Sequence, residues 1–226
     1  VTSAVPRIVD SGLAPQILEY IDLLTMSVMV QAGNLELGVP QDVRDTALAY
    51  LVVVLENAHE DRLDADVQRL GELIAGLGAM DVYVLPAGAA TQIIEARERA
   101  FWLAKANGAT AIVDIVVPRA SIPDFMAKVS ELAGATGSWI AGCGHAGDGN
   151  VHLGVFQGDP DKLHHVMTGL YRAGMELGGA ISGEHGLGTD KRGYFLELED
   201  PTKIDLMRRI KAAFDPNGIL NPGAVF

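Results

Sequence analysis

Residues 139–156 read WIAGCGHAGDGNVHLGVF. Small and apolar residues flank Asp148-Gly149, a strong two-residue hairpin signal because both positions tolerate positive φ. If Asp148-Gly149 is the turn, His145 lies directly opposite His152. Residues opposed in this way share a face, with Cβ atoms roughly 4.5–5.5 Å apart. The stretch therefore predicts a β-hairpin that presents two imidazoles side by side.

Two neighbouring imidazoles can hold one divalent metal ion. A third ligand is expected from residues 182–188, SGEHGLG, in the form of Glu184 or His185. Adjacent strand residues point to opposite faces, so both can serve one site only if the flanking glycines let the backbone turn. Two histidines and one glutamate leave a coordination position open, and the remaining histidine can act as an acid or base. The alternatives are a hairpin with two incidental histidines and a glycine-rich loop with a surface Glu-His pair.

Outward from the hairpin, short apolar runs alternate with helical patterns. The runs predict strands over residues 17–21, 50–55, 82–85 and 111–117, and the start of another at 180–182. The helical patterns cover residues 26–31, 63–77, 92–106, 122–133, 162–177 and 202–214. This order predicts one α+β domain over residues 1–226. Two ferredoxin-like halves are expected to form one antiparallel sheet with helices on one face.

Composition excludes several classes of partner. The net charge of -12 disfavours nucleic acid and anionic membrane surfaces, which attract basic proteins. The one cysteine, Cys143, excludes an intrachain disulfide and fits a reducing compartment, where it is expected to be a small buried apolar residue. No apolar run is long enough to span a bilayer, and no signal peptide follows Val1. The sequence thus predicts a fragment of a cytoplasmic protein, with peripheral membrane association as the alternative.

An acidic protein that binds a carboxylate needs a local positive group. Arg97 lies in EARER, residues 95–99, and an arginine can hold a carboxylate in a bidentate fork. The alternative is an ordinary solvated helix face. The pair Lys191-Arg192 is also expected to be solvated. Neither G-x-G-x-x-G nor the phosphate-loop pattern is present, so the chain is not expected to carry its own nucleotide site.

Four motifs resemble the C-terminal domain of the FAD-linked oxidase family. They are GLAPQILEYID at residues 12–22, GHAGDGNVH at 144–152, SGEHGLGTDKR at 182–192 and FDPNGILNPG at 214–223. This family includes the flavin subunit of glycolate oxidase, D-lactate dehydrogenase and D-2-hydroxyglutarate dehydrogenase. The resemblance implies a vanillyl-alcohol-oxidase-like architecture in which an FAD-binding domain, absent from this chain, precedes it and binds most of the FAD. The chain alone is then expected to bind no FAD and to be inactive.

The resemblance also implies roles for single residues. Zinc or a similar ion would be held by His145, His152 and Glu184, while His185 would contact the substrate or accept its hydroxyl proton. Arg97 matches the arginine that clamps the substrate carboxylate. Asn221, in the last motif, matches a cofactor-binding position. These roles imply oxidation of a 2-hydroxy acid to a 2-oxo acid, with FAD as the hydride acceptor and an unknown final electron acceptor.

Three departures from the family's hydroxyglutarate enzyme concern the substrate. Phe101 and Ile112 replace a threonine and a lysine, and Gly154 replaces a polar residue. The pocket is therefore expected to favour a monocarboxylic 2-hydroxy acid such as lactate, glycolate or a longer apolar one. The competing interpretations are a metal-dependent hydrolase and a non-catalytic subunit without its flavin partner. The face expected to meet the flavin domain would be apolar, which could make the isolated chain a homodimer.

Overall fold

The chain is described by a computed structural model that covers residues 1–33, 35 and 38–226. Its strands are β1 (Ile17–Asp22), β2 (Ala49–Val54), β3 (Ala111–Val116), β4 (Trp139–His145), β5 (Asn150–Phe156) and β6 (Ala180–Ile181). The helices that precede β3 are α1 (Ala4–Asp10), α2 (Leu23–Gly33), α3 (Gln41–Thr46), α4 (Glu60–Gly76), α5 (Ala87–Glu98) and α6 (Ala100–Ala106). Later helices are α7 (Ile122–Thr136), α8 (Pro160–Glu176), α9 (Arg192–Leu198) and α10 (Pro201–Phe214), and a 3-10 turn covers Arg119–Ser121.

The described strands form one six-stranded antiparallel sheet in the order β2-β1-β4-β5-β3-β6. This confirms the predicted α+β class and the single antiparallel sheet. The second half, β3-α7-β4-β5-α8-β6, has the β-α-β-β-α-β order of a ferredoxin-like unit. The first half adds only β1 and β2 to the sheet. The strand predicted at residues 82–85 was wrong, because this exposed segment pairs with no described strand.

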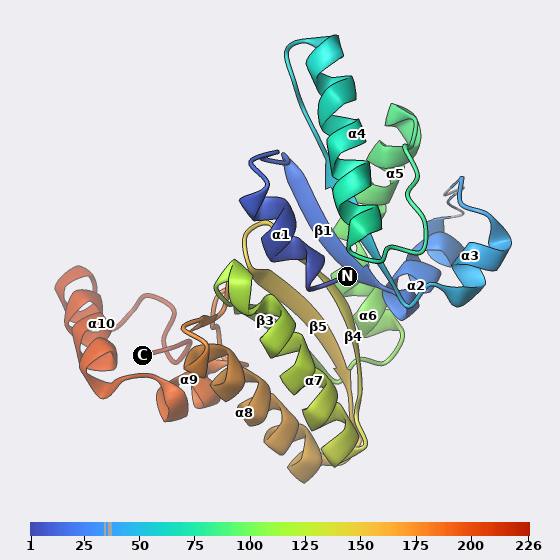
Figure 1. Cartoon of the computed structure of the whole chain (residues 1–226). Coiled ribbons are helices and arrows are strands. Elements are labelled where there is room, and N and C mark those ends of the chain that lie inside the picture. Colours follow the sequence, from blue (N-terminus) through green and yellow to red (C-terminus); the bar gives the residue numbers. More distant parts are fainter. Residues whose placement is uncertain (34, 36–37) are drawn as a thin grey trace.

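Helices cover both faces of the sheet, so the prediction of helices on one face was wrong. On one face, α7 and α8 cover β3 and β5 (Figure 1). Phe125 of α7 and Tyr171 of α8 are fully buried in this layer. On the other face, α2 and α5 bury Met29 and Ile93 against Ile21 and Cys143 of the strands. The predicted helix at residues 92–106 is divided into α5 and α6 by a break at Arg99. The second face is the one that carries the polar residues described below.

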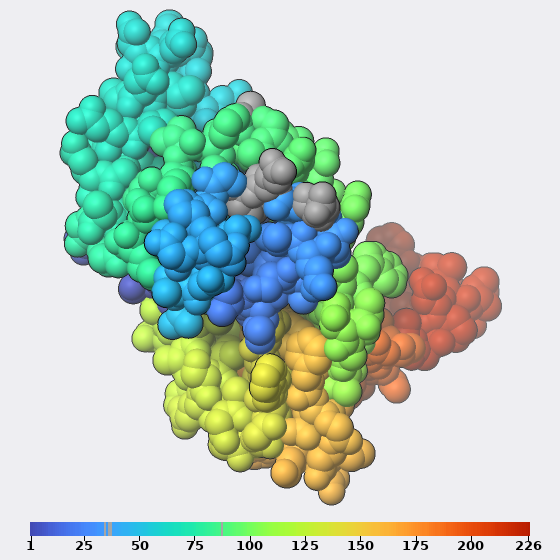
Figure 2. Space-filling view, turned by 90° about the vertical axis from the view of Figure 1, so that its right-hand side faces the viewer, coloured from blue at the N-terminus to red at the C-terminus, as the bar shows by residue number. Residues whose placement is uncertain are grey.

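Two helices extend away from this body. α4 and the C-terminal α10 project from separate ends of the molecule, as the ribbon and the space-filling view both show (Figures 1 and 2). Within the described residues, no helix combines the length and the apolar content needed to cross a bilayer. The sheet and the helices that pack on it therefore provide the rigid frame in which a site can be positioned.

Candidate functional site

The carboxylate of Asp114, on β3, organises the site from inside the sheet. It is fully buried and accepts hydrogen bonds from the Ser182 hydroxyl at 2.7 Å and the His185 backbone N–H at 2.8 Å. The backbone N–H groups of Gly183 and Glu184 also donate to it, at 3.1 and 3.2 Å, and the Lys191 ammonium donates at 3.2 Å. Burial raises the pKa of Asp114, but these hydrogen bonds and the Lys191 charge outweigh it and hold the pKa below its usual range.

This network bends the chain directly after β6. Ser182 has a left-handed φ of 72°, and a Cβ on Gly183 would lie only 2.4 Å from the Asn150 side chain. The turn brings the Glu184 carboxylate and the His185 ring to the same side, with Oε1 and Nε2 3.5 Å apart. The backbone turn that the sequence required for both residues to share one site is therefore present.

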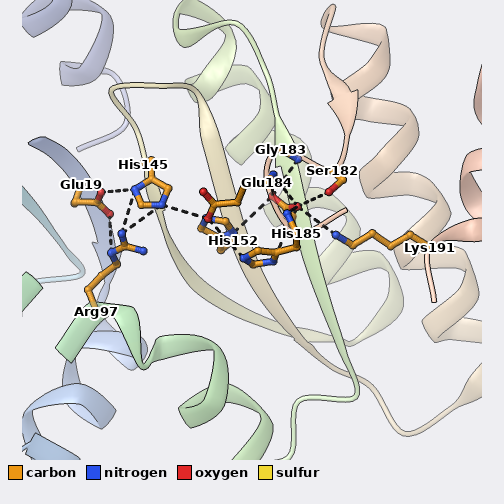
Figure 3. A network of polar contacts seen from close by, with 10 residues as sticks. Glu19, Arg97, His145, His152, Ser182, Gly183, Glu184, His185 and Lys191 are labelled. Atoms are coloured by element: carbon orange, nitrogen blue, oxygen red, sulfur yellow. Dashed lines mark hydrogen bonds and ion pairs between the residues drawn. The ribbon is translucent and has the colours of Figure 1, made fainter. Parts of the chain in front are cut away.

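The two hairpin histidines meet Glu184 at the centre of the site (Figure 3). Glu184 Oε1 lies 3.0 Å from His152 Nε2 and 3.4 Å from His145 Nε2. One ligand atom from each of these residues lies within 4.8 Å of the others. Both ring nitrogens of His152 are buried, and among the described residues neither makes a hydrogen bond of good geometry, although Nε2 is close to Glu184. Burial lowers the pKa of His152 to about 4, so the ring is neutral at pH 7, as a metal ligand must be.

The register of the hairpin differs from the predicted one. Cys143, and not His145, pairs directly with His152, so the loop is longer than Asp148-Gly149 alone. His145 is displaced by two residues, which keeps its side chain on the same face. The two rings remain close, with centroids 5.3 Å apart. The prediction that the two histidines lie close together is thus confirmed, although the prediction that they pair directly was wrong.

A second group of potential ligands combines Asp114, His152 and His185. The oxygens of Asp114 are already occupied by the donors described above. The set of His145, His152 and Glu184 is the better fit to a divalent ion, because two imidazoles and one carboxylate suit zinc and leave a position open. His185 stacks on His152 with ring centroids 4.8 Å apart and stays outside this set.

Arg97 reaches the same cluster from the last turn of α5. Its Nε lies 3.3 Å from Glu19 Oε2, and its Nη2 lies 3.2 and 3.3 Å from the two ring nitrogens of His145. Glu19, a buried carboxylate on β1, also accepts from His145 Nδ1 at 2.6 Å. This hydrogen bond raises the pKa of His145, and it directs the other nitrogen toward Glu184. Arg97 therefore belongs to the site and not to a solvated helix face.

A cavity of about 350 Å³ joins these groups. Its polar end consists of Arg97, His145, His152, Glu184 and His185, and its other walls come from α6 and the middle of the sheet. Cys143 also lines the cavity and is buried, as expected, with its pKa raised to about 12 by burial. An arginine, three imidazoles and a carboxylate around one cavity can bind an anion, hold a cation and move a proton.

Some residues have surroundings other than those expected from the sequence, and two residues of the site were not predicted. Lys191 is buried and bonded to Asp114, so the prediction that it is solvated was wrong, whereas Arg192 is exposed and donates to the Val225 carbonyl at 3.0 Å. Asn221 lies in an exposed turn with a φ of 47°, outside the cavity lining, and its cofactor role stays a prediction. Glu19 and Asp114 were missed. The signal for both was a carboxylate in the middle of an apolar strand.

The fold and the site define the class of protein: an α+β domain that combines a His-His-Glu cluster with a partly buried arginine in one cavity. The chain belongs to the FAD-linked oxidase family. Its residues 1–225 match the family model described as "FAD linked oxidases, C-terminal domain".

The relatives agree with this assignment. An uncharacterized FAD-linked oxidoreductase of Mycobacterium tuberculosis is 58% identical over all of this chain and 49% of its own length. The D-lactate dehydrogenase of Anaerostipes hadrus is 31% identical over 99% of this chain and 49% of its own length. The glycolate oxidase subunit GlcD of Bacillus subtilis is 28% identical over 98% of this chain and 47% of its own length. The chain thus spans about half the length of the curated relatives that it matches.

Solved structures support the fold. A p-cresol methylhydroxylase with substrate bound has a TM-score of 0.62 at 16% identity, over 99% of this chain and 50% of that chain. The 4-ethylphenol oxidase of Gulosibacter chungangensis also has a TM-score of 0.62, at 15% identity, over 99% of this chain and 51% of its own. Family membership favours an oxidoreductase over the metal-dependent hydrolase considered above.

Proposed function

We propose that this chain is the substrate- and metal-binding half of an FAD-dependent 2-hydroxy-acid dehydrogenase. The observation that carries the proposal is the convergence of Arg97, the His145-His152-Glu184 cluster and His185 on one cavity. Relatives named D-lactate dehydrogenase and glycolate oxidase subunit GlcD support the choice of substrate class. Here "holoenzyme" denotes this chain combined with its FAD-binding part.

Each side chain has a defined task in this proposal. Arg97 binds the substrate carboxylate through its guanidinium fork. His145, His152 and Glu184 would hold a divalent cation, with zinc as the best fit to the donor set. When bound, that cation would supply Lewis acidity that lowers the pKa of the substrate hydroxyl. His185 accepts the hydroxyl proton at Nε2, the nitrogen that lies 3.5 Å from Glu184.

The flavin would supply the hydride-accepting chemistry from outside this chain. In this chain, the cavity residues that would hold the cation, together with His185, would bind the 2-hydroxy acid, and the sequence contains no phosphate-binding loop. The purified chain is therefore expected to lack a flavin absorbance band. A yellow preparation with near-stoichiometric flavin would contradict this division of tasks.

The lining of the cavity favours a single carboxylate on the substrate. Among the described residues that line the cavity, Arg97 is the single Lys or Arg side chain. Ile112 and Phe101 occupy the positions where a second carboxylate would need a positively charged or polar partner. An unpaired buried charge is costly. We propose monocarboxylic 2-hydroxy acids as substrates. Ile112→Lys in the holoenzyme should narrow the preference for D-lactate over D-2-hydroxyglutarate, as measured by kcat/KM for both.

The experiment that tests the function measures oxidation of a panel of 2-hydroxy acids by the holoenzyme with an artificial electron acceptor, alongside metal analysis. Turnover that depends on flavin and on the cation supports the proposal. Turnover of an ester or amide without flavin would favour a hydrolase. Preference of the wild-type holoenzyme for the dicarboxylate would contradict the proposed monocarboxylate class.

Arg97→Ala should lower kcat/KM for every 2-hydroxy acid by roughly thirty- to a thousandfold, or about 2–4 kcal/mol. The reason is the loss of a charge-assisted fork that also positions the substrate. Arg97→Lys should recover only part of this, since a lysine is a point charge. The matched control is Arg99→Ala, because Arg99 is exposed and lies outside the cavity lining. Equal kcat/KM values for the Arg97→Ala and Arg99→Ala variants would show that Arg97 does not bind the substrate carboxylate.

A further inference from the structure

Two neighbouring rows of residues cross the sheet at the candidate site. Asp114, His152 and Cys143 lie side by side on β3, β5 and β4, because Asp114 pairs with His152 and His152 pairs with Cys143. These residues form the polar row. Two residues along each strand, on the same face, lie Ile112, Gly154 and Ala141. This second set, the apolar row, also lines the cavity.

Helix α6 closes the cavity over the apolar row. Phe101 and Ala104 of this helix line the same cavity as Ile112 and Gly154. The helix approaches the sheet closely at this point, since a Cβ added to Gly154 would lie 3.3 Å from the Ala104 Cβ. The row and the helix together make an uncharged compartment that extends the polar end of the cavity.

The size of the cavity exceeds what a short acid requires. Its volume is about 350 Å³. A water-sized group occupies about 30 Å³, so there is room for on the order of a dozen such groups, and lactate has only about six non-hydrogen atoms. The excess space adjoins apolar side chains, and its one further charged lining residue, Glu98, would repel a distal carboxylate. A ligand that fills the cavity needs an apolar extension.

We infer that the apolar row and α6 form a subsite for a long apolar side chain of the substrate. The preferred substrate class is then 2-hydroxy monocarboxylates with an extended or branched hydrocarbon side chain, rather than glycolate or lactate. The inference rests on the proposed function, because Arg97 and the cation cluster must hold the carboxylate and hydroxyl at the polar end. It adds the direction in which the side chain lies, from the polar row toward Ile112 and Ala141.

The test compares kcat/KM of the holoenzyme for glycolate, D-lactate, D-2-hydroxyhexanoate and D-2-hydroxyoctanoate. Each buried methylene should raise kcat/KM about fourfold, the change that corresponds to about 0.8 kcal/mol. The hexanoate, with about three methylenes more than lactate, should therefore exceed lactate by about sixtyfold. Equal or higher kcat/KM for lactate would overturn the subsite.

The variant Ala104→Leu places hydrocarbon in the proposed compartment. It should lower kcat/KM for the hexanoate at least about tenfold more than kcat/KM for lactate, because the added atoms occupy the space of the hexanoate's extra methylenes. Ala106→Leu makes the same change at an exposed position of the same helix and should alter neither substrate. Ala141→Leu, from the opposite wall, should reproduce the effect if Ala104→Leu fails to fold. Equal losses for both acids would overturn the subsite.

A binding measurement separates the subsite from the proposed function. The thermal unfolding midpoint of the holoenzyme should rise more with D-2-hydroxyhexanoate than with D-lactate, and Ala104→Leu should remove the difference. If no acid is oxidised but this length-dependent shift persists, the proposed function fails and the subsite stands. If neither acid shifts the midpoint and none is oxidised, both are overturned.

Discussion

Replacing His152 with alanine should remove the divalent cation from the holoenzyme and lower kcat/KM by at least about a thousandfold, the upper range for loss of one preorganised electrostatic group. His152 is central to the cluster, since its Nε2 lies 3.0 Å from Glu184 and its ring contacts both His145 and His185. Among the described residues, neither of its buried nitrogens makes a hydrogen bond of good geometry, and Nε2 approaches the Glu184 carboxylate, as two ligands of one metal ion would. Metal analysis of protein purified without a chelator, together with steady-state kinetics, measures both effects.

The matched control is His165→Ala, because His165 is exposed on α8 and is not among the residues that line the cavity. It should keep metal content and kcat/KM at the wild-type level. The double variant His145→Ala, His152→Ala gives the strongest test. A full equivalent of metal in that protein would show that the cation binds elsewhere.

Replacing Asp114 with asparagine should destabilise the chain by about 3–5 kcal/mol, the usual cost of breaking a buried ion pair from one side. The buried Lys191 ammonium would lose its partner, and the N–H groups of Gly183, Glu184 and His185 would lose a charged acceptor. The free energy of unfolding, from urea titration of the chain, measures the cost. The orientation of Glu184 depends on this network, so metal affinity of the holoenzyme should fall about 10–100-fold as well.

The double variant Asp114→Asn, Lys191→Met separates the ion pair from the rest of the network. Removal of the ammonium should restore a part of the lost stability, while the metal affinity should remain low because the backbone donors still lack the carboxylate. A loss below about 1 kcal/mol in Asp114→Asn would contradict the role assigned to this residue. An unchanged metal affinity in Asp114→Asn would contradict this role as well.

The local parts of this molecule could be predicted from its sequence. The hairpin at residues 139–156 and its two histidines follow from Asp148-Gly149 and strand patterning, and the structure confirms both. The exact register could not be predicted, because loops of different length place the same side chains on one face when the shift is two residues. The exposed run at 82–85 has strand-like residues, but tertiary structure gives it no described partner strand.

The long-range parts could not be predicted from local patterns. Glu19 and Asp114 occur within apolar runs, and nothing in those runs reveals which partners they meet. Glu19 meets Arg97 and His145 only because β1 pairs with β4. Lys191 has the composition of a solvated residue, yet the turn after β6 buries its ammonium against Asp114. Pairing of distant strands, rather than residue type, decides these cases.

The pairing of β1 with β4 also sets the order in which the site is expected to assemble during folding. His145 and His152 belong to one hairpin, whereas Glu19 joins His145 across 126 residues of chain. Closing a long loop costs more conformational entropy, and contacts distant in sequence slow the folding of a domain. We therefore expect the β3–β6 unit to acquire its histidines early, and Arg97 to be fixed only when β1 docks. In pulse-labelling hydrogen exchange, backbone amides of β5 should gain protection before those of β1.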